Sequence, residues 1–267
     1  MNNSRTSVSM RYGFTLVELL VVIAATVLLV TLFMSCVPSY RGNGHRTTCK
    51  ANIKGIAEAC AAYMSNPAMH RKSKLGNAMP TVTPAPSRSN WSSADSGNPS
   101  ALWLLVKYKF IGRESFLCPS AEFSRGFRTP TTKEFRFADN TLSYSYMSQV
   151  KFTDASTNTE IEVTSNFSIG LKPSELAIIA DANPRSRVGR QDLDNDQRGR
   201  NSLNHDQEGQ NVGFLGGNAD WFSTTTIPGT RPLTDSDALD DIYQSCGSDA
   251  EDAAGRRGAL NDAFLIP

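Results

Sequence analysis

The sequence has almost no surplus of charge of either sign. Its 267 residues include 27 Lys and Arg against 26 Asp and Glu, which leaves a formal net charge of +1. The basic residues are scattered along the chain. Proteins that bind nucleic acids concentrate positive charge on one face, because contacts to phosphates supply much of the binding free energy. The composition therefore predicts that nucleic acid is not a partner.

Histidine is also scarce, with 3 residues in the chain. His45, His70 and His205 lie far apart, and their spacing matches neither a zinc site nor a catalytic triad. Because a histidine without partner groups seldom carries catalysis, we expect His205 to hydrogen-bond the backbone. The sequence therefore predicts that the protein is not an enzyme, and an anchored hydrolase is the least favoured class.

The 5 cysteines are an odd number, so at least one is expected to be unpaired. Cys36 ends an apolar segment and resembles a small apolar residue there. On one helix, Cys49 and Cys60 would lie about 16 Å apart, too far for a mutual disulfide. Any bridge from this helix must therefore reach Cys118 or Cys246. We expect one of the two helix cysteines, Cys49 or Cys60, to pair with Cys118. Which of them does so stays open, because disulfide connectivity is not readable from sequence.

One long apolar run is present, from Phe14 to Val37. It is long enough to cross a bilayer core of about 30 Å as a helix. Before Cys36, its only ionisable side chain is Glu18. A carboxylate inside a membrane costs about 3 kcal/mol on insertion scales and usually has a partner that offsets this cost. Glu18 is therefore a candidate functional residue.

The residues around this carboxylate, Arg11-Tyr12-Gly13-Phe14-Thr15-Leu16-Val17-Glu18-Leu19-Leu20-Val21-Val22-Ile23-Ala24, resemble the type IV prepilin signature of pilins and type II secretion pseudopilins. In that family, a prepilin peptidase cleaves after the glycine, here Gly13, and methylates the new N-terminal residue, here Phe14. By resemblance, Glu18 would neutralise the Phe14 ammonium of a neighbouring subunit during assembly. The resemblance implies a single-pass protein of the inner membrane with an extracytoplasmic head. Its partners would be the peptidase, other pilins or pseudopilins and the assembly platform.

Three alternatives compete with this interpretation. A secretory signal peptide would have a shorter apolar region and a small-x-small cleavage site. Phe33-Met34-Ser35-Cys36 loosely resembles a lipoprotein signal, although its upstream positions are bulkier than that motif prefers. A plain membrane anchor would leave Gly13-Phe14 and the basic leader residues Arg5 and Arg11 unexplained.

A second helical segment is expected after the apolar run. Pro38, Gly42 and Gly44 predict a kink or a short break at the membrane surface. Apolar residues then recur every three or four positions from His45 to Met64, which predicts an amphipathic helix that ends at Asn66-Pro67. In pilins, such a stripe packs on the sheet of the head, although an ordinary core helix would show the same stripe.

The rest of the chain predicts a head of strands and loops. Residues 70–100 are rich in Ser, Pro, Asn and Gly and indicate a mobile surface loop. Ala101–Tyr108 is expected to form a short helix. Ser143–Met147 alternates like a half-buried strand, and the apolar Leu176–Ala180 predicts a strand covered on both faces, followed by a turn at Asp181.

Near the C-terminus, the spacing predicts a hairpin: strand Gln210–Leu215, a primed turn at Gly216-Gly217 and strand Ala219–Phe222. With His205, it resembles a large processing-associated prepilin-like family, in which a histidine precedes an Asp-Gly turn by about ten residues. Here the turn reads Gly216-Gly217, so the family's aspartate is absent.

An acidic stretch raises the question of calcium. Asp192, Asp194 and Asp196 place carboxylates at alternate positions, as calcium loops often do. The stretch is not an EF-hand, because Gln197 and Leu203 stand where glycine and glutamate are required. A second acidic group comprises Asp235, Asp237, Asp240 and Asp241. Some pseudopilins hold calcium in a C-terminal loop, but acidic runs are usually solvated, so we expect no cofactor.

These observations predict an α+β, pilin-like protein with an antiparallel sheet packed on a long N-terminal helix. The expected parts are a leader (1–13), a transmembrane and assembly helix (14–37), its amphipathic continuation (38–66) and an extracytoplasmic head (67–267). The predicted function is that of a structural subunit of a type IV pilus or a type II secretion pseudopilus. The alternative is a membrane-anchored binding module that uses prepilin export without polymerising and contacts its partner through the loop 70–100.

Overall fold

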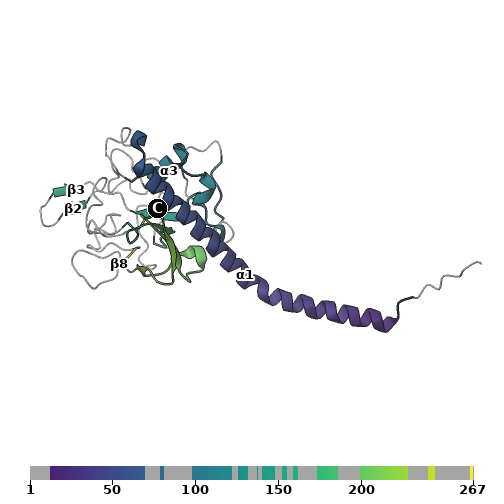
Figure 1. Ribbon diagram of the computed structural model, residues 1–267. Coiled ribbons are helices and arrows are strands. Elements are labelled where there is room, and N and C mark those ends of the chain that lie inside the picture. Colours follow the sequence, from purple (N-terminus) through teal and green to yellow (C-terminus); the bar gives the residue numbers. More distant parts are fainter. Residues whose placement is uncertain are drawn as a thin grey trace, which may run out of the picture. The chain divides into compact units, whose positions relative to one another are not determined.

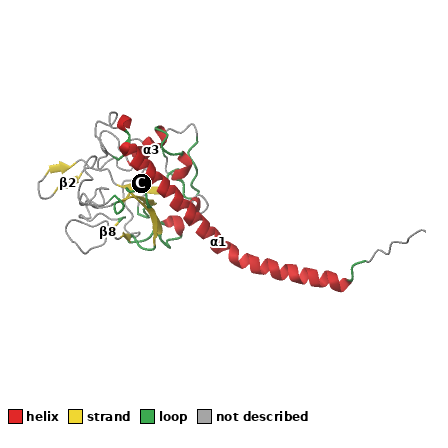
Figure 2. Ribbon diagram, viewed as in Figure 1, coloured by secondary structure: helices red, strands yellow, loops and turns green. Residues whose placement is uncertain are grey.

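The computed structural model describes residues 13–69, 79–80, 98–121, 126–131, 137, 140–147, 152–154, 159–161, 173–185, 199–227, 240–243 and 265–266. The chain divides into two units, Met1–Asn43 and Gly44–Pro267. Helices and an antiparallel sheet both occur, so the fold class is α+β (Figures 1 and 2).

In the first unit, the N-terminal part of helix α1 (Leu16–Ser65) is apolar on every side. The window Leu16–Phe33 has a mean hydropathy of 2.8 and contains no buried residue, so this segment is long and apolar enough to span a membrane. Thr15 precedes the helix and forms a capping box with Glu18. The Glu18 carboxylate accepts hydrogen bonds from the Thr15 backbone N–H at 2.8 Å and from its hydroxyl at 2.9 Å.

Helix α1 runs through Pro38, Gly42 and Gly44 without interruption, so the predicted break is wrong. Proline removes one intrahelical hydrogen bond, and a glycine costs about 1 kcal/mol relative to alanine. A helix of 50 residues makes enough other hydrogen bonds to continue past these positions. The predicted end at Asn66-Pro67 is confirmed, because α1 stops at Ser65.

The second unit contains a five-stranded antiparallel sheet in the order β6-β5-β4-β1-β9. Its strands are β1 (Tyr144–Met147), β4 (Ala177–Asp181), β5 (Gln210–Phe214), β6 (Ala219–Phe222) and β9 (Leu265–Ile266). Two further antiparallel pairs join β2 (Phe152–Asp154) to β3 (Thr159–Ile161) and β7 (Thr226–Ile227) to β8 (Asp240–Asp241). The second unit also contains helix α3 (Asn98–Lys107) and the 3-10 turns η1 (Arg113–Phe116) and η3 (Leu203–His205).

The C-terminal part of α1 packs on this sheet through the predicted apolar stripe (Figure 2). The buried residues of the stripe are Cys49, Ile53, Ile56, Ala57, Cys60 and Tyr63, while Met64 is only partly buried. Gly213 of β5 lies at the closest approach. A Cβ atom there would meet Cγ2 of Ile53 at 2.7 Å and Cγ2 of Ile179 at 2.8 Å. Only glycine lets helix and sheet approach this closely.

Several local predictions need correction. Helix α3 begins at Asn98, so residues 98–100 belong to a helix and not to the predicted loop; most of residues 70–97 lie outside the described residues. Strand β1 is buried at all four positions, because it lies inside the sheet between β4 and β9. Strand β4 is buried throughout, as its apolar sequence predicts.

The β5–β6 connection also differs from the prediction. Strand β5 ends at Phe214, and the Gly217 N–H donates to the Phe214 carbonyl at 2.9 Å. Gly217 has φ +83°, and Gly216 is not among the glycines with positive φ. Both primed two-residue turns, I′ and II′, need positive φ at the first central residue, which would be Gly216, so the predicted turn type is wrong. A hydrogen-bonded turn followed by a left-handed glycine makes the reversal instead.

Candidate functional site: a histidine beside a buried disulfide

The site begins with an aspartate at the end of strand β4. Asp181 is the last residue of β4 and pairs with Tyr144, the first residue of β1. Its side chain is fully buried and points toward β5. There the Oδ2 atom accepts hydrogen bonds from the Asn211 backbone N–H at 2.7 Å and from the Asn211 amide at 3.2 Å. Oδ1 accepts one from the Asn204 amide at 3.0 Å.

His205 approaches this carboxylate from the turn before β5. It ends η3, whose first residues are capped by the Ser202 hydroxyl, which accepts from the Asn204 N–H. Asp206 and Gln207 then adopt left-handed conformations, with φ of 54° and 63°. Two such residues in succession reverse the chain between η3 and β5, and the His205 ring is thereby enclosed with 6% of its surface exposed.

The third component is a disulfide between Cys49 and Cys118. Cys49 lies on the buried stripe of α1, and Cys118 follows η1, where its N–H donates to the Ser143 hydroxyl. Both residues are fully buried. Of the pairings left open by the sequence, the structure contains this one. Cys60 is a free, buried thiol, and burial raises its pKa to about 12.

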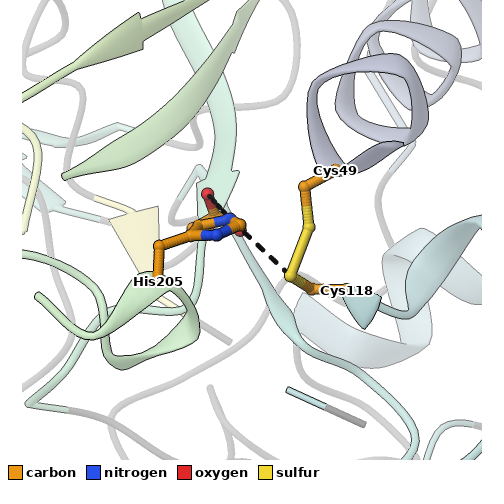
Figure 3. A group of neighbouring side chains, drawn as sticks. Cys49, Cys118 and His205 are labelled. Carbon is orange, nitrogen blue, oxygen red and sulfur yellow. Dashed lines mark hydrogen bonds and ion pairs between the residues drawn. A yellow bond between two sulfur atoms is a disulfide. The ribbon is translucent and has the colours of Figure 1, made fainter. Parts of the chain in front are cut away.

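The His205 ring lies at the centre of this group (Figure 3). Its Nε2 atom is 3.3 Å from Asp181 Oδ2 and 3.7 Å from Cys118 Sγ. The amide nitrogen of Asn211 lies 3.4 Å from the same atom. On the other side of the ring, Nδ1 is 3.4 Å from the Ser120 hydroxyl. We expected His205 to hydrogen-bond the backbone, but the polar neighbours of its ring are the side chains of Cys118, Ser120, Asp181 and Asn211.

Aromatic and charged side chains cover the histidine. The Trp221 ring meets the His205 ring edge-on, with centroids 5.4 Å apart. The Arg46 guanidinium lies 3.7 Å from the Trp221 centroid and pairs with Glu208 at 2.7 Å. This stack joins α1 to the β5–β6 hairpin and keeps water away from the imidazole.

Buried tyrosines complete the surroundings. The Tyr144 hydroxyl donates to Cys49 Sγ at 3.4 Å, and the Tyr243 hydroxyl donates to the Asp181 carbonyl at 2.7 Å. Burial raises the pKa of both tyrosines well above the ordinary value, and the negative charge of Asp181 raises it further. Both hydroxyls therefore remain protonated donors at neutral pH.

Two kinds of chemistry can be compared with this geometry. Thiol–disulfide exchange needs a sulfur that an external thiolate can reach, and both sulfurs are inside the folded unit. A serine hydrolase triad places serine at Nε2 and the carboxylate at Nδ1. Here Ser120 lies at Nδ1 and Asp181 at Nε2, which is the reverse arrangement. In this form, the disulfide links α1 covalently to the chain after η1 inside the second unit.

The other predicted site residues are distributed differently. Gly13, Phe14 and Glu18 lie together at the start of α1, in the first unit. Gly216 and Gly217 belong to the turn after β5, away from the carboxylate that His205 contacts. Asp192, Asp194 and Asp196 lie outside the described residues, as do Cys246 and His70, so the calcium prediction stays a prediction.

Sequence reasoning missed Asp181, Ser120 and Asn211. It assigned Asp181 to a turn, although a lone carboxylate directly after a fully apolar strand is a signal that it lies at the edge of the core. Ser120 and Asn211 carry no comparable signal. They reach His205 only because η1, β4 and β5 converge at one end of the sheet.

Comparison of the chain with family models, curated proteins and solved structures finds no match.

Proposed function

We propose that the chain is a structural subunit of the pilin type, a pilin or pseudopilin. In this proposal, prepilin peptidase cleaves it after Gly13 and methylates Phe14. The mature subunit is held in the inner membrane by α1, with its head on the extracytoplasmic side. Subunits then assemble through this helix into a type IV pilus or a type II secretion pseudopilus.

One observation carries the proposal. The helix that begins at Leu16, two residues after Phe14, exposes apolar side chains all round over Leu16–Phe33, with Glu18 as the one charge among them. A helix with no polar face is suited to lipid or to copies of itself. An acidic group in such a surface requires a cationic or hydrogen-bonding partner, which a neighbouring N-terminal ammonium would supply.

The head is consistent with export. A disulfide such as Cys49–Cys118 persists in oxidising compartments and is rare in the cytosol. It links α1 directly to the chain after η1, so that the helix and the head cannot separate. A subunit pulled along a filament axis by its helix would need such a link.

A specific observation also favours the alternative, a membrane-anchored binding module that never polymerises. The Glu18 carboxylate already has two donors within its own chain, the Thr15 N–H and hydroxyl. A capping box of this kind stabilises a helix start, and it gives Glu18 a role without any neighbouring subunit.

Two experiments test the proposal. Intact-mass spectrometry of the membrane protein, with and without prepilin peptidase, should find a mature chain that begins at Phe14 and carries one added methyl group. A chain cleaved elsewhere, or lipidated at Cys36, would contradict it.

The second experiment separates the two functions. Glu18→Ala should abolish filament assembly while processing and membrane insertion continue. Thr26→Ala is the matched control, because the Thr26 hydroxyl donates only to the Ile23 carbonyl of its own helix. If the parent chain forms no filament and the Glu18→Ala variant is processed, inserted and active in partner binding like the parent, the anchored binding module is favoured.

A further inference from the structure

Four side chains of ligand type meet at the disulfide, and the proposed function uses none of them as ligands. One sulfur each from Cys49 and Cys118, one oxygen of Asp181 and one ring nitrogen of His205 all lie within 4.8 Å of one another. All four residues are buried. They come from α1, from the segment after η1, from β4 and from η3, so folding alone brings them together.

We propose that these four side chains form a tetrahedral Zn²⁺ site when Cys49 and Cys118 are reduced. The disulfide and the zinc centre are then two alternative states of the same group. The inference is independent of whether the chain assembles into a filament, because every ligand belongs to the second unit.

The distances fit a zinc centre. Tetrahedral geometry with ordinary bond lengths gives edges of about 3.4 Å between nitrogen and oxygen and about 3.6 Å between nitrogen and sulfur. The observed separations are 3.3 Å from His205 Nε2 to Asp181 Oδ2 and 3.7 Å from His205 Nε2 to Cys118 Sγ. Two thiolates would have to lie about 3.8 Å apart, which the separated sulfurs can reach by side-chain rotation.

Charge favours a cation at this position. Asp181 is fully buried, and a buried carboxylate is costly unless a cation or several donors compensate it. In the disulfide form, three hydrogen bonds from Asn204 and Asn211 and the nearby His205 ring compensate Asp181, and reduction adds two ionisable thiols to the same group. With both thiols ionised, the site would hold three negative charges, which a divalent ion largely neutralises.

The surrounding residues already provide the support that a zinc centre requires. A ligating histidine normally has its second ring nitrogen fixed by a hydrogen bond, and Ser120 lies at Nδ1 of His205. Asn204 and Asn211 orient the Asp181 carboxylate. The Tyr144 hydroxyl donates to Cys49 Sγ, where it would stabilise a thiolate.

The chemistry balances with an external reductant. A dithiol or a phosphine supplies two electrons, the S–S bond breaks, and each sulfur takes up a proton. Zn²⁺ then displaces both thiol protons and binds the two thiolates, neutral His205 and ionised Asp181. Because both sulfurs are buried, reduction has to occur before the head closes, so the zinc form is reached by folding the reduced chain.

The test uses the full-length chain in detergent micelles. One sample is unfolded, reduced with a phosphine and refolded with Co²⁺, which replaces Zn²⁺ and has an absorption spectrum that reports thiolate ligands. The other sample keeps the disulfide intact. We expect about one tightly bound ion per chain in the reduced sample and none in the oxidised sample. Zn²⁺ should displace the cobalt and bleach the spectrum.

Variants identify the ligands. Ser120→Ala should weaken metal binding about 10- to 100-fold by releasing the imidazole. His205→Cys should retain binding and add a third thiolate to the cobalt spectrum, a gain of signal that a misfolded variant would not produce. Cys60→Ala is the matched control, since Cys60 is a buried cysteine outside the group, and it should bind cobalt like the parent chain.

Three results would overturn the proposal. They are a reduced, refolded chain that binds no cobalt, a His205→Cys variant with an unchanged spectrum, and binding that Cys60→Ala abolishes.

Discussion

The two halves of helix α1 differ in what surrounds them, although they form one continuous element. Ile23 in the N-terminal half is 54% exposed, whereas Ile53 in the C-terminal half is fully buried against the sheet. The first half is apolar all round, and the second is apolar on one face. Side-chain chemistry therefore separates a segment suited to lipid or neighbouring helices from one that packs in the core of the second unit.

The largest predicted effect tests the covalent link that only the second half has. Replacing both Cys49 and Cys118 with serine removes a bridge across a sequence separation of 69 residues. For a loop of this length, we expect the free energy of unfolding of the head to fall by about 4 kcal/mol. Denaturant unfolding in micelles, followed by Trp221 fluorescence, measures the loss. A change below about 1 kcal/mol would show that packing holds α1 to the head without the bridge.

A matched pair of isoleucines tests the packing itself. Ile53→Ala should destabilise the head by about 3 kcal/mol, because it leaves a cavity between α1 and the sheet. Ile23→Ala should leave head stability within about 0.5 kcal/mol of the parent chain, since Ile23 is exposed and is not among the buried core residues of the described part of the chain. Denaturant midpoints of the two variants provide the comparison. Equal losses would contradict the division of α1 into two environments.

A pair of glycines sharpens the same contrast. Gly213→Ala should cost about 2 kcal/mol, because the new methyl group would overlap Ile53 and Ile179. Gly42→Ala has nothing within 4 Å of the new atom and lies inside a helix, so it should be neutral or stabilise by up to about 1 kcal/mol. The midpoint of thermal unfolding should therefore fall for Gly213→Ala, and it should rise or stay unchanged for Gly42→Ala.

The sequence predicted what depends on local pattern. The stripe from Cys49 to Tyr63, the stop after Ser65 and the strand at Ala177 each follow from periodicity or from runs of apolar residues within one element. It misjudged features set by context. Strand β1 was expected to be half-buried, but it is enclosed because β9 pairs with it from the far end of the chain.

The candidate site depends even more on tertiary context than the strands do. His205 was considered isolated because its partners, Cys118 and Asp181, are remote in sequence and neither forms a recognisable spacing with it. Only the antiparallel order of β1, β4 and β5 places the end of β4 beside the start of β5. Cys118 follows η1 and Asp181 ends β4. Nothing in the sequence indicates that the two residues lie close together, because their proximity depends on the sheet topology.

The smallest predicted effect is a pH dependence of stability that arises in the second unit and not in the exposed half of α1. Burial raises the pKa of Tyr144, Tyr146 and Tyr243 well above the ordinary value, whereas residues 14–33 contain no tyrosine. In the unfolded chain, these groups lose protons as the pH rises through about 10, while the folded chain keeps them. Stability contributed by the three groups is therefore complete below this range and decreases above it.

At pH 10, each tyrosine should lower the free energy of unfolding by about 0.4 kcal/mol, or about 1.2 kcal/mol together. Denaturant unfolding at pH 8 and pH 10 measures this difference. The buried Cys60 thiol, whose pKa is also raised, adds to the difference, so Tyr146→Phe should reduce it by about 0.4 kcal/mol, because phenylalanine has no proton to lose. Replacing residues of the exposed half, such as Ile23→Ala, should leave the pH dependence unchanged. A stability that rises between pH 8 and pH 10 would contradict the buried, protonated state of these hydroxyls.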